Sequence, residues 1–325
     1  MKKITVSVPA TTANLGAGFD CMGLALNLRS KVEVWEIPEG LEIEVEGEAA
    51  NQLPLDASNL VVRAAEKVFE RVKRHPTGVH LRLVNGIPLA SGLGSSSAAT
   101  VGGLVAANAL VDGRLTRPEL LQMACDMEGH ADNAAPTLYG GLALVSGTGE
   151  DLIAHCLTVA PIKVVIALPD VRLSTAEARA ALPKEVPLKN AVYNIGHALL
   201  TAEALASGDF ELLRKAMGDR LHEPFRIPLI PGSAEASAEA RQAGAVAVTL
   251  SGAGPSLAAF MPPGAPHEGV AAAMKSAFEA AGVGCRTYAL PVDSQGAKLK
   301  WRLDEAELPV WVKTAPPRRE WVLEA

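Results

Sequence analysis

A segment rich in glycine and serine, PLASGLGSSSAAT (Pro88–Thr100), has the clearest chemical potential in the sequence. Gly92 and Gly94 allow the backbone to approach a bound group closely, because they carry no Cβ. Backbone N–H groups at such a turn point the same way, and at a helix N-terminus they add to the positive end of the dipole. The segment lies between a predicted strand and a predicted helix, and its consecutive serines suit phosphate oxygens or a metal-bound water. It therefore predicts an anion site.

The segment differs from two common phosphate motifs. A Walker loop requires GxxxxGK[ST], and no lysine follows Gly94. A dinucleotide fingerprint requires a third glycine, and Ser97 stands at that position. Taken alone, the pattern is equally typical of a small-residue turn that packs a helix tightly against a sheet.

A second segment, MEGHADNAAPTLYGG (Met127–Gly141), concentrates polar groups between apolar helices. Two carboxylates, an imidazole and an amide lie within the six residues from Glu128 to Asn133. This density predicts a site, although two of the four side chains are also compatible with an exposed surface.

The elements that must position these segments alternate between strands and helices. Apolar alternation at 4–8, 32–34, 41–45 and 79–83 predicts strands, and the middle two are expected to form a hairpin around Pro38-Glu39-Gly40. Caps and helical spacing predict helices in the first half at 60–74, 96–111 and 116–127. In the second half, the expected helices are 189–206, 209–219, 233–243 and 267–281, and the expected strands are 162–168, 246–250, 256–261 and 285–290. Periodicity alone thus supports a mixed α and β protein.

The composition is that of a globular protein. The 325 residues, of which 49% are apolar, suffice for two domains or one large one. The net charge of −6 disfavours nucleic acid or an anionic membrane as the main partner. The sequence has no 18-residue apolar run and no basic, apolar leader, which favours a cytoplasmic protein without a signal peptide.

Two further segments lie at predicted strand ends: PATTANLGAGFDCMGLAL (Pro9–Leu26) and TLSGAGPSLAAF (Thr249–Phe260). With the glycine-serine segment they resemble, in order, the three signature motifs of the GHMP kinase superfamily, from the first strand to about residue 290. The resemblance implies an α+β fold with an N-terminal ATP-binding domain (1–155) that is ribosomal protein S5 domain 2-like. It also implies a C-terminal ferredoxin-like domain (156–295), a site in the cleft between the two, and a tail (296–325) that packs on the surface.

The same resemblance assigns a nucleotide site. Such kinases carry a phosphate loop of the form PxxxGLGSSA, here with Ser97 in place of alanine. It implies that ATP binds with Mg²⁺, that Ser96 and Glu128 hold the metal, and that Asn59 lies near the adenine. The expected ATP-binding loop consists of Pro88, Leu89, Ala90, Ser91, Gly92, Leu93, Gly94, Ser95, Ser96 and Ser97.

Within the superfamily, Met127–Gly141 is similar to the EGHxDNVAPxxxGG segment of the homoserine kinase family, with Ala134 where valine is common. Mevalonate-type members usually carry PSGxDN there, and galactokinases GxMDQ. ANLGAGFDCMGLAL also resembles that family's ANLGPGFDxxGLAL, with Ala17 in place of proline. The resemblance implies a homodimeric transferase that phosphorylates the side-chain hydroxyl of L-homoserine in threonine biosynthesis.

The family resemblance also implies specific substrate contacts. Asp20 would pair with the substrate ammonium, and two arginines with its α-carboxylate, because a guanidinium binds a carboxylate bidentately. Arg179 matches the family's STxEAR segment and Arg226 its EPxR segment, with Arg220 as an alternative to Arg226. The expected substrate-binding residues are Asn14, Asp20, His130, Asn133, Thr175, Arg179 and Arg226, and the expected catalytic residues are Glu128, Asp132 and Asn133.

Two other functions are weighed against this one. The first is another small-molecule kinase of the superfamily that acts on mevalonate or a sugar. Neither substrate requires an ammonium partner together with two arginines for a carboxylate, so the EGHADN segment and the paired arginines argue against it. A non-catalytic ligand sensor tends to lose metal or loop residues, whereas Ser96, Glu128, Asp132 and the loop glycines are all present.

We predict that Asp132 matters less for turnover than Glu128. Phosphoryl transfer depends mainly on positioning and charge neutralisation, so a base is dispensable where a metal ligand is not. Asp132→Asn should therefore retain more kcat than Glu128→Gln in an assay of ADP release. Collapse of the first variant with survival of the second would reject this ranking.

Overall fold

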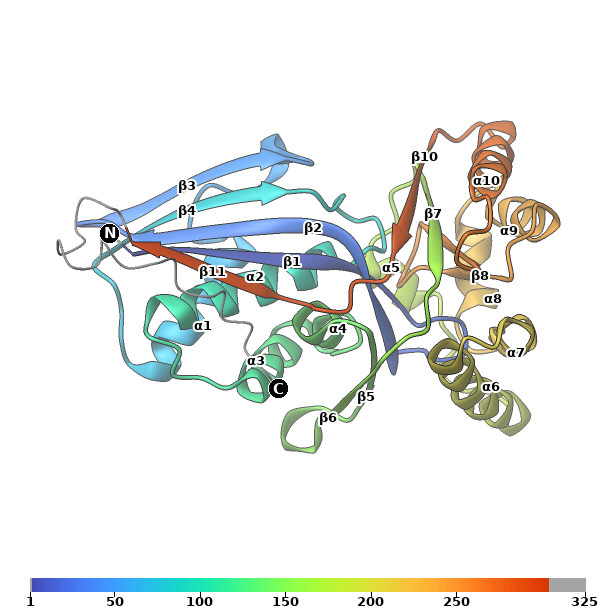
Figure 1. The fold of residues 1–325 in the computed structure, drawn as a ribbon, viewed down its shortest axis with the longest axis horizontal. Coiled ribbons are helices and arrows are strands. Elements are labelled where there is room, and N and C mark those ends of the chain that lie inside the picture. The colour runs from blue at the N-terminus through green and yellow to red at the C-terminus, as the bar shows by residue number, and fades with distance from the viewer. Residues whose placement is uncertain (1, 304–325) are drawn as a thin grey trace.

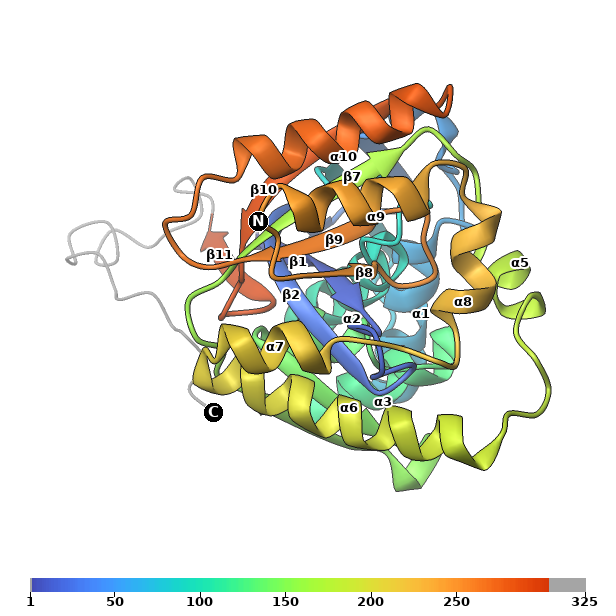
Figure 2. The same ribbon diagram turned by 90° about the vertical axis from the view of Figure 1, so that its right-hand side faces the viewer.

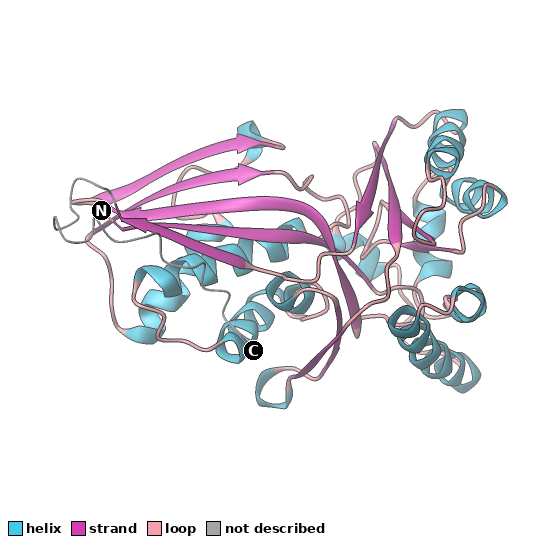
Figure 3. Ribbon diagram, viewed as in Figure 1, coloured by secondary structure: helices cyan, strands magenta, loops and turns pink. Residues whose placement is uncertain are grey.

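The computed structural model describes residues 2–303 and contains two β-sheets that follow one another along the long axis of the molecule (Figures 1 and 3). The N-terminal sheet is built on two long antiparallel strands, β1 (Lys2–Ala13) and β2 (Met22–Glu36). Along β1, Ile4, Val6 and Val8 are buried in the core, as their alternation predicts. In the described part of the chain, no helix combines the length and the apolar character that crossing a membrane requires.

The N-terminal sheet has the strand order β11-β1-β2-β4-β3, with β5 paired with β2 and β6. Its helices lie on one face (Figure 1). Helix α2 packs closely on α1 at Gly103, where an added Cβ would lie only 2.6 Å from the Val61 carbonyl oxygen. The other strands are β3 (Gly40–Gly47), β4 (Gly78–Asn85), β5 (Leu142–Ser146), β6 (Ile153–Leu157) and β11 (Lys298–Leu303). The helices are α1 (Leu60–Val72), α2 (Ser95–Leu110), α3 (Arg117–Glu128) and α4 (Ala134–Tyr139), with short 3-10 turns at Ala50–Gln52 and Gly149–Asp151.

The predicted hairpin between β2 and β3 is wrong, because β4 lies between these two strands. β2 pairs with β4 in the antiparallel sense, and β3 pairs with β4 in the parallel sense. Side chains of β3 contact those of β4: Glu42 lies 2.8 Å from His80 Nδ1, and Glu46 accepts from Arg82 Nη2 at 2.8 Å. Opposite charges on neighbouring strands stabilise their pairing, so β3 packs on β4 as an exposed edge strand.

The chain returns to the N-terminal sheet at its C-terminal end. β11 pairs antiparallel with β1, from Lys298 opposite Ser7 to Leu303 opposite Lys2. Residues 298–303 were expected in a tail on the surface, but they form a strand of the sheet. Pairing with β1 satisfies their backbone hydrogen-bonding groups. The domain boundary expected after residue 155 falls within β6, and residues 304–325 of the expected tail lie outside the described part of the chain.

The C-terminal sheet is antiparallel and has the order β10-β7-β9-β8, so its strands stand in the order fourth, first, third, second. This is the expected ferredoxin-like order. Two helices, α9 and α10, cover one face (Figure 2) and share a core with Val165, Leu257 and Ala259. The strands are β7 (Lys163–Pro169), β8 (Ala247–Leu250), β9 (Leu257–Met261) and β10 (Cys285–Pro291), and the helices are α5 (Thr175–Ala180), α6 (Leu188–Ser207), α7 (Phe210–Ala216), α8 (Glu223–Arg226), α9 (Ser233–Gln242) and α10 (Glu268–Ala280), with a 3-10 turn at Ile227–Leu229.

Candidate active site

The phosphate loop (residues 88–97) runs from β4 into the first turn of α2. Gly94 is the N-cap of α2 with φ 67°, and Gly92 has φ 76°, which is the region that favours glycine. Space is equally restrictive, since a Cβ on Gly94 would lie 2.0 Å from Thr11 Oγ1, and one on Gly92 would lie 2.3 Å from the Ser251 carbonyl oxygen. The first turn of α2 holds no acidic residue, so its N–H groups and dipole favour an anion.

The first motif (residues 9–26) and the third motif (residues 249–260) hold this loop in place. The Ser251 hydroxyl donates to the Gly92 carbonyl oxygen at 2.7 Å and lies 2.9 Å from the Thr12 hydroxyl. The Thr11 N–H donates to the Leu93 carbonyl oxygen at 3.1 Å. Three segments that are far apart in the sequence therefore meet at one place.

Asn14 connects the first and third motifs. Its Nδ2 donates to the Gly252 carbonyl oxygen at 2.8 Å, and its Oδ1 accepts from the Asp20 N–H at 2.9 Å. The residue is buried. Asn14 was expected to contact substrate, and in the structure its amide fixes the turn that carries Asp20.

Glu128 faces the first turn of α2 from the end of α3. Its Oε2 accepts from the Ser97 hydroxyl, and its buried Oε1 has no hydrogen-bond partner among the described residues. Burial raises the pKa of this carboxyl. An unpartnered buried carboxylate oxygen beside a phosphate loop fits a ligand of Mg²⁺, which usually takes only one or two protein carboxylates and completes its shell with phosphate and water oxygens. Ser96, the other expected ligand, has an exposed side chain on the same turn, so its role stays a prediction.

His130, Asp132 and Asn133 form one hydrogen-bonded group next to the loop. The buried Asp132 Oδ1 lies 2.7 Å from His130 Nδ1 and accepts from Asn133 Nδ2 at 3.2 Å. Asn133 Oδ1 accepts from the Thr11 hydroxyl at 2.7 Å. The hydrogen bond to Asp132 raises the pKa of His130. Asp132 thus orients both neighbours, and the Asn133 amide lies beside Gly94 at the mouth of the loop.

Two of the expected substrate ligands bind each other. Arg179 donates from both Nη atoms to the two Asp20 carboxylate oxygens, each at 2.9 Å. Arg226 lies beside them with only 2% of its surface exposed, and its Nε donates to the Ala178 carbonyl oxygen at 3.1 Å. Burial and the nearby Arg179 lower the pKa of Arg226. Both guanidinium groups lie within 6 Å of the Phe19 ring centre, at 5.8 and 5.1 Å.

Arg220, the alternative to Arg226, makes a different contact. Its guanidinium lies over the Tyr193 ring, 3.8 Å from the ring centre. The choice of Arg226 over Arg220 for the second carboxylate position stays a prediction.

Two further expected residues have local roles in the structure. Asn59 caps α1, since its Oδ1 accepts from the Val61 N–H at 3.0 Å and its Nδ2 donates to the Pro54 carbonyl oxygen at 2.8 Å. Thr175 is exposed in the first turn of α5, where Ser174 is the cap. Their assignments to adenine and substrate stay predictions.

Family models match both parts of the chain. A model described as GHMP kinases N terminal domain matches residues 59–141, and one described as GHMP kinases C terminal matches residues 201–280. The homoserine kinase of Moorella thermoacetica is 45% identical over 293 residues, which cover 90% of this chain and 98% of that protein. The homoserine kinase of Prochlorococcus marinus is 41% identical over 310 residues, which cover 94% and 98%.

The chain belongs to the homoserine kinase family of GHMP kinases. The crystal structure of homoserine kinase from Cytophaga hutchinsonii has a TM-score of 0.84 and 34% identity, and the match covers 92% of this chain and 97% of that one. Mevalonate kinase of L. major, in complex with R-mevalonate, matches with a TM-score of 0.70 at 16% identity over 89% and 95% of the chains, which shows a shared fold only. The expected fold, family and class of ATP-dependent kinase are confirmed.

Sequence reasoning missed a buried network behind the homoserine kinase motifs. Asp219 accepts from the N–H groups of His222 and Glu223 at 2.8 and 2.7 Å. Glu223 in turn accepts from the Leu250 N–H at 2.7 Å, immediately before the third motif contacts the phosphate loop. Glu223 thus joins the segment of Arg226 to the third motif. The available signal was the segment DRLHEPFR (residues 219–226), which holds three ionisable residues besides its two arginines.

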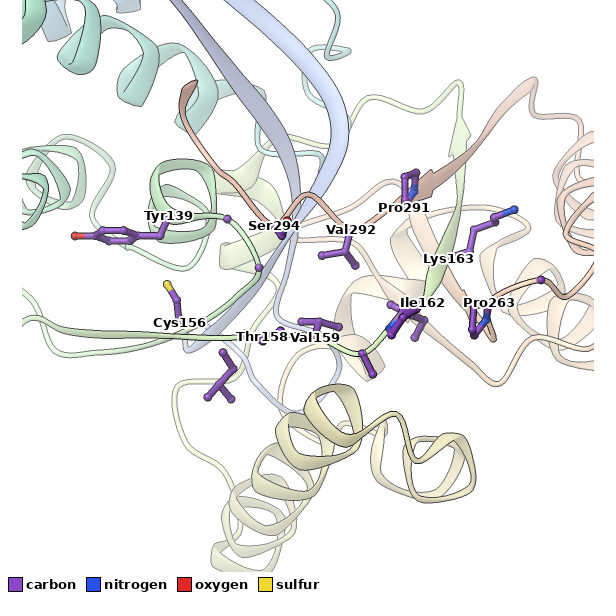
Figure 4. A pocket seen from close by; sticks show the side chains of 16 residues that line it. Tyr139, Cys156, Thr158, Val159, Ile162, Lys163, Pro263, Pro291, Val292 and Ser294 are labelled. Carbon is purple, nitrogen blue, oxygen red and sulfur yellow. The ribbon is translucent and has the colours of Figure 1, made fainter. Parts of the chain in front are cut away.

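A separate pocket of about 470 Å³ lies where the chain crosses between the two sheets (Figure 4). Its lining includes Tyr139, Cys156, Lys163 and Val292. None of the expected site residues lines it, so the candidate active site is defined by the polar groups above and not by this pocket.

The network predicts a pH dependence of stability. Burial raises the pKa of Glu223 to about 7, so the native state binds this proton more tightly than the unfolded chain. This contribution to stability is present below the ordinary carboxyl pKa of 4.5 and is lost as the pH rises through about 7. The free energy of unfolding in urea should therefore fall from about pH 5 to about pH 8, and Glu223→Gln should flatten that slope, since the amide oxygen still accepts from Leu250. Glu235→Gln, at an exposed site on α9, is the matched control; a slope that survives in Glu223→Gln contradicts the assignment.

Proposed function

We propose that this protein transfers the γ-phosphate of ATP to the side-chain hydroxyl of L-homoserine and produces O-phospho-L-homoserine for threonine biosynthesis. The observation that carries the proposal is the bidentate pair of Arg179 with Asp20 beside the buried Arg226. This cluster holds one anion and two cations, which is the complement of an α-amino acid. The identity of 41–45% to two homoserine kinases supports the same substrate.

A bound amino acid would take the place of the internal ion pair. Its ammonium would pair with Asp20, and its carboxylate with Arg179 and Arg226. The substrate ammonium would replace Arg179 as the partner of Asp20, and the substrate carboxylate would replace Asp20 as the partner of Arg179. The buried Arg226 would gain an anionic partner, which offsets the cost of its desolvation. A sugar or a hydroxy acid without an ammonium group would leave Asp20 unmatched.

The reacting hydroxyl would lie near Asn133, because the Asn133 amide is fixed by Thr11 and Asp132 at the edge of the phosphate loop. Alignment of this hydroxyl with the γ-phosphorus is the main contribution expected of these residues. The N–H groups of the loop and of the first turn of α2 would bind phosphate oxygens. Mg²⁺, when bound with ATP, supplies neutralisation of phosphate charge, and Glu128 with Ser96 would hold it.

Magnesium use, a homodimeric assembly and a cytoplasmic location are part of this proposal. The fit of Glu128 supports the metal. Neither nucleic acid nor a membrane is expected as a partner.

The direct test is release of ADP with ATP and Mg²⁺ against L-homoserine, L-threonine, L-serine, mevalonate and galactose. Turnover with L-homoserine above all others supports the proposal. Turnover with mevalonate or galactose instead would keep the phosphate loop and discard the substrate contacts, and absence of turnover across the panel would favour a ligand sensor.

We predict that Arg226→Lys raises the KM for L-homoserine about 10- to 100-fold, because an ammonium cannot bind a carboxylate with two parallel hydrogen bonds. The KM for ATP should change little, since the loop is untouched. Arg220→Lys is the matched control, because Arg220 lies on Tyr193. Thermal melting checks that both variants are folded, and an equal rise of both KM values in Arg226→Lys would contradict the assignment.

A further inference from the structure

The turn between β1 and β2 carries one aromatic side chain, Phe19. This residue directly precedes Asp20 in the sequence and is partly buried. The centre of its ring lies 5.1 Å from the guanidinium carbon of Arg226 and 5.8 Å from that of Arg179. It also lies 5.2 Å from the centre of the His222 ring, with 26° between the two ring planes. One phenyl ring therefore contacts both arginines that are expected to bind the substrate carboxylate.

The two arginines need a group that holds them close together. Burial and the nearby charge of Arg179 lower the pKa of Arg226, which shows that the two cations act on each other. Among the described residues, Arg226 is held by one hydrogen bond, from its Nε to the Ala178 carbonyl oxygen. The face of an aromatic ring attracts a guanidinium group within about 6 Å of the ring centre, and more strongly where water is excluded. Phe19 thus offsets part of the repulsion between the two arginines.

An aromatic ring holds the arginines without using the groups that would bind the substrate. A carboxylate, carbonyl or amide oxygen at this position would accept hydrogen bonds from the guanidinium N–H groups and compete with the substrate carboxylate. A phenyl ring has no lone pair for such hydrogen bonds and attracts positive charge through its π face. Phe19 therefore suits a position that must retain two cations and keep their donors for a ligand.

The stacking partner of Phe19, His222, is a neutral ring. Its Nε2 lies 2.9 Å from the Gly16 carbonyl oxygen, which can only accept, so Nε2 carries the proton. The buried Nδ1 has no hydrogen-bond partner among the described residues, which fits the unprotonated nitrogen of a neutral imidazole. Burial lowers the pKa of His222. The imidazole thus stacks on Phe19 without adding a third positive charge beside the two arginines.

We propose that Phe19 is a positioning residue whose ring holds the guanidinium groups of Arg179 and Arg226 in the arrangement that binds the substrate α-carboxylate. The inference rests on the proposed function and deepens it. It names the side chain that keeps the carboxylate site assembled when the substrate ammonium takes Asp20 from Arg179. Since Phe19 acts through the arginines, it should affect binding of the amino acid and leave phosphoryl transfer unchanged.

Replacement of the ring by an aliphatic side chain tests this role. Phe19→Leu should raise the KM for L-homoserine about 5- to 20-fold and leave kcat and the KM for ATP within about twofold of the wild type. With the methyl ester of L-homoserine, which has no carboxylate charge, the same variant should lose less than about twofold in kcat/KM. Phe19→Tyr keeps the π face and should match the wild type. Phe210→Leu is the matched control, since Phe210 is also partly buried but lies on α7. An equal loss with both substrates, or a Phe19→Tyr variant as impaired as Phe19→Leu, would overturn the proposal.

Fluorinated phenylalanines at position 19 separate the electrostatic contact from packing. Fluorine withdraws electron density from the ring face with little change in shape, so the KM for L-homoserine should rise from phenylalanine through monofluoro- to pentafluorophenylalanine. Thermal melting of these proteins checks the fold, so this series decides the question even if Phe19→Leu is unstable. A KM that does not depend on fluorination would overturn the proposal and leave the proposed function intact. A wild type that does not turn over L-homoserine would overturn both.

Discussion

Close packing of the phosphate loop against two other backbone segments is the constraint on which the rest of the site depends. Gly92 and Gly94 lie so near Ser251 and Thr11 that no side chain fits at either position. Because Ser251 lies between β8 and β9 of the C-terminal sheet and Thr11 lies near the end of β1, the loop joins both parts of the molecule. The positions of Asn133 and Asp20 follow from this contact, since Thr11 holds the first and Asn14 the second.

Buried charge is the second theme of the structure. Arg226 and the side chain of Asp219 are both withdrawn from water, which is costly unless each finds partners. Asp219 accepts from three backbone N–H groups and the Asn194 amide, and these bonds replace its hydration. Arg226 makes only one hydrogen bond to the protein among the described residues, and therefore retains capacity for a carboxylate.

Local patterns predicted most elements and the family, because helix spacing, strand alternation and the three motifs are encoded in neighbouring residues. Helix α1, for example, was expected at 60–74 and runs from Leu60 to Val72. Strand partners were less accessible from the sequence. Glu42 contacts His80 and Glu46 contacts Arg82 across more than thirty residues of sequence, whereas local spacing suggested a hairpin that does not form. The Glu223 to Leu250 contact was missed for the same reason, since only the fold brings these residues together. The ion pair of Arg179 with Asp20 likewise joins two residues that motif reasoning placed separately on the substrate.

The central claim is that the site recognises both charges of an α-amino acid. The most direct measurement compares kcat/KM for L-homoserine with the values for its methyl ester, which lacks the carboxylate charge, and for 4-hydroxybutyrate, which lacks the ammonium group. The account predicts that each analogue loses about 10-fold or more, since each leaves one side of the Asp20, Arg179 and Arg226 cluster unmatched. Equal turnover of either analogue and L-homoserine would contradict it.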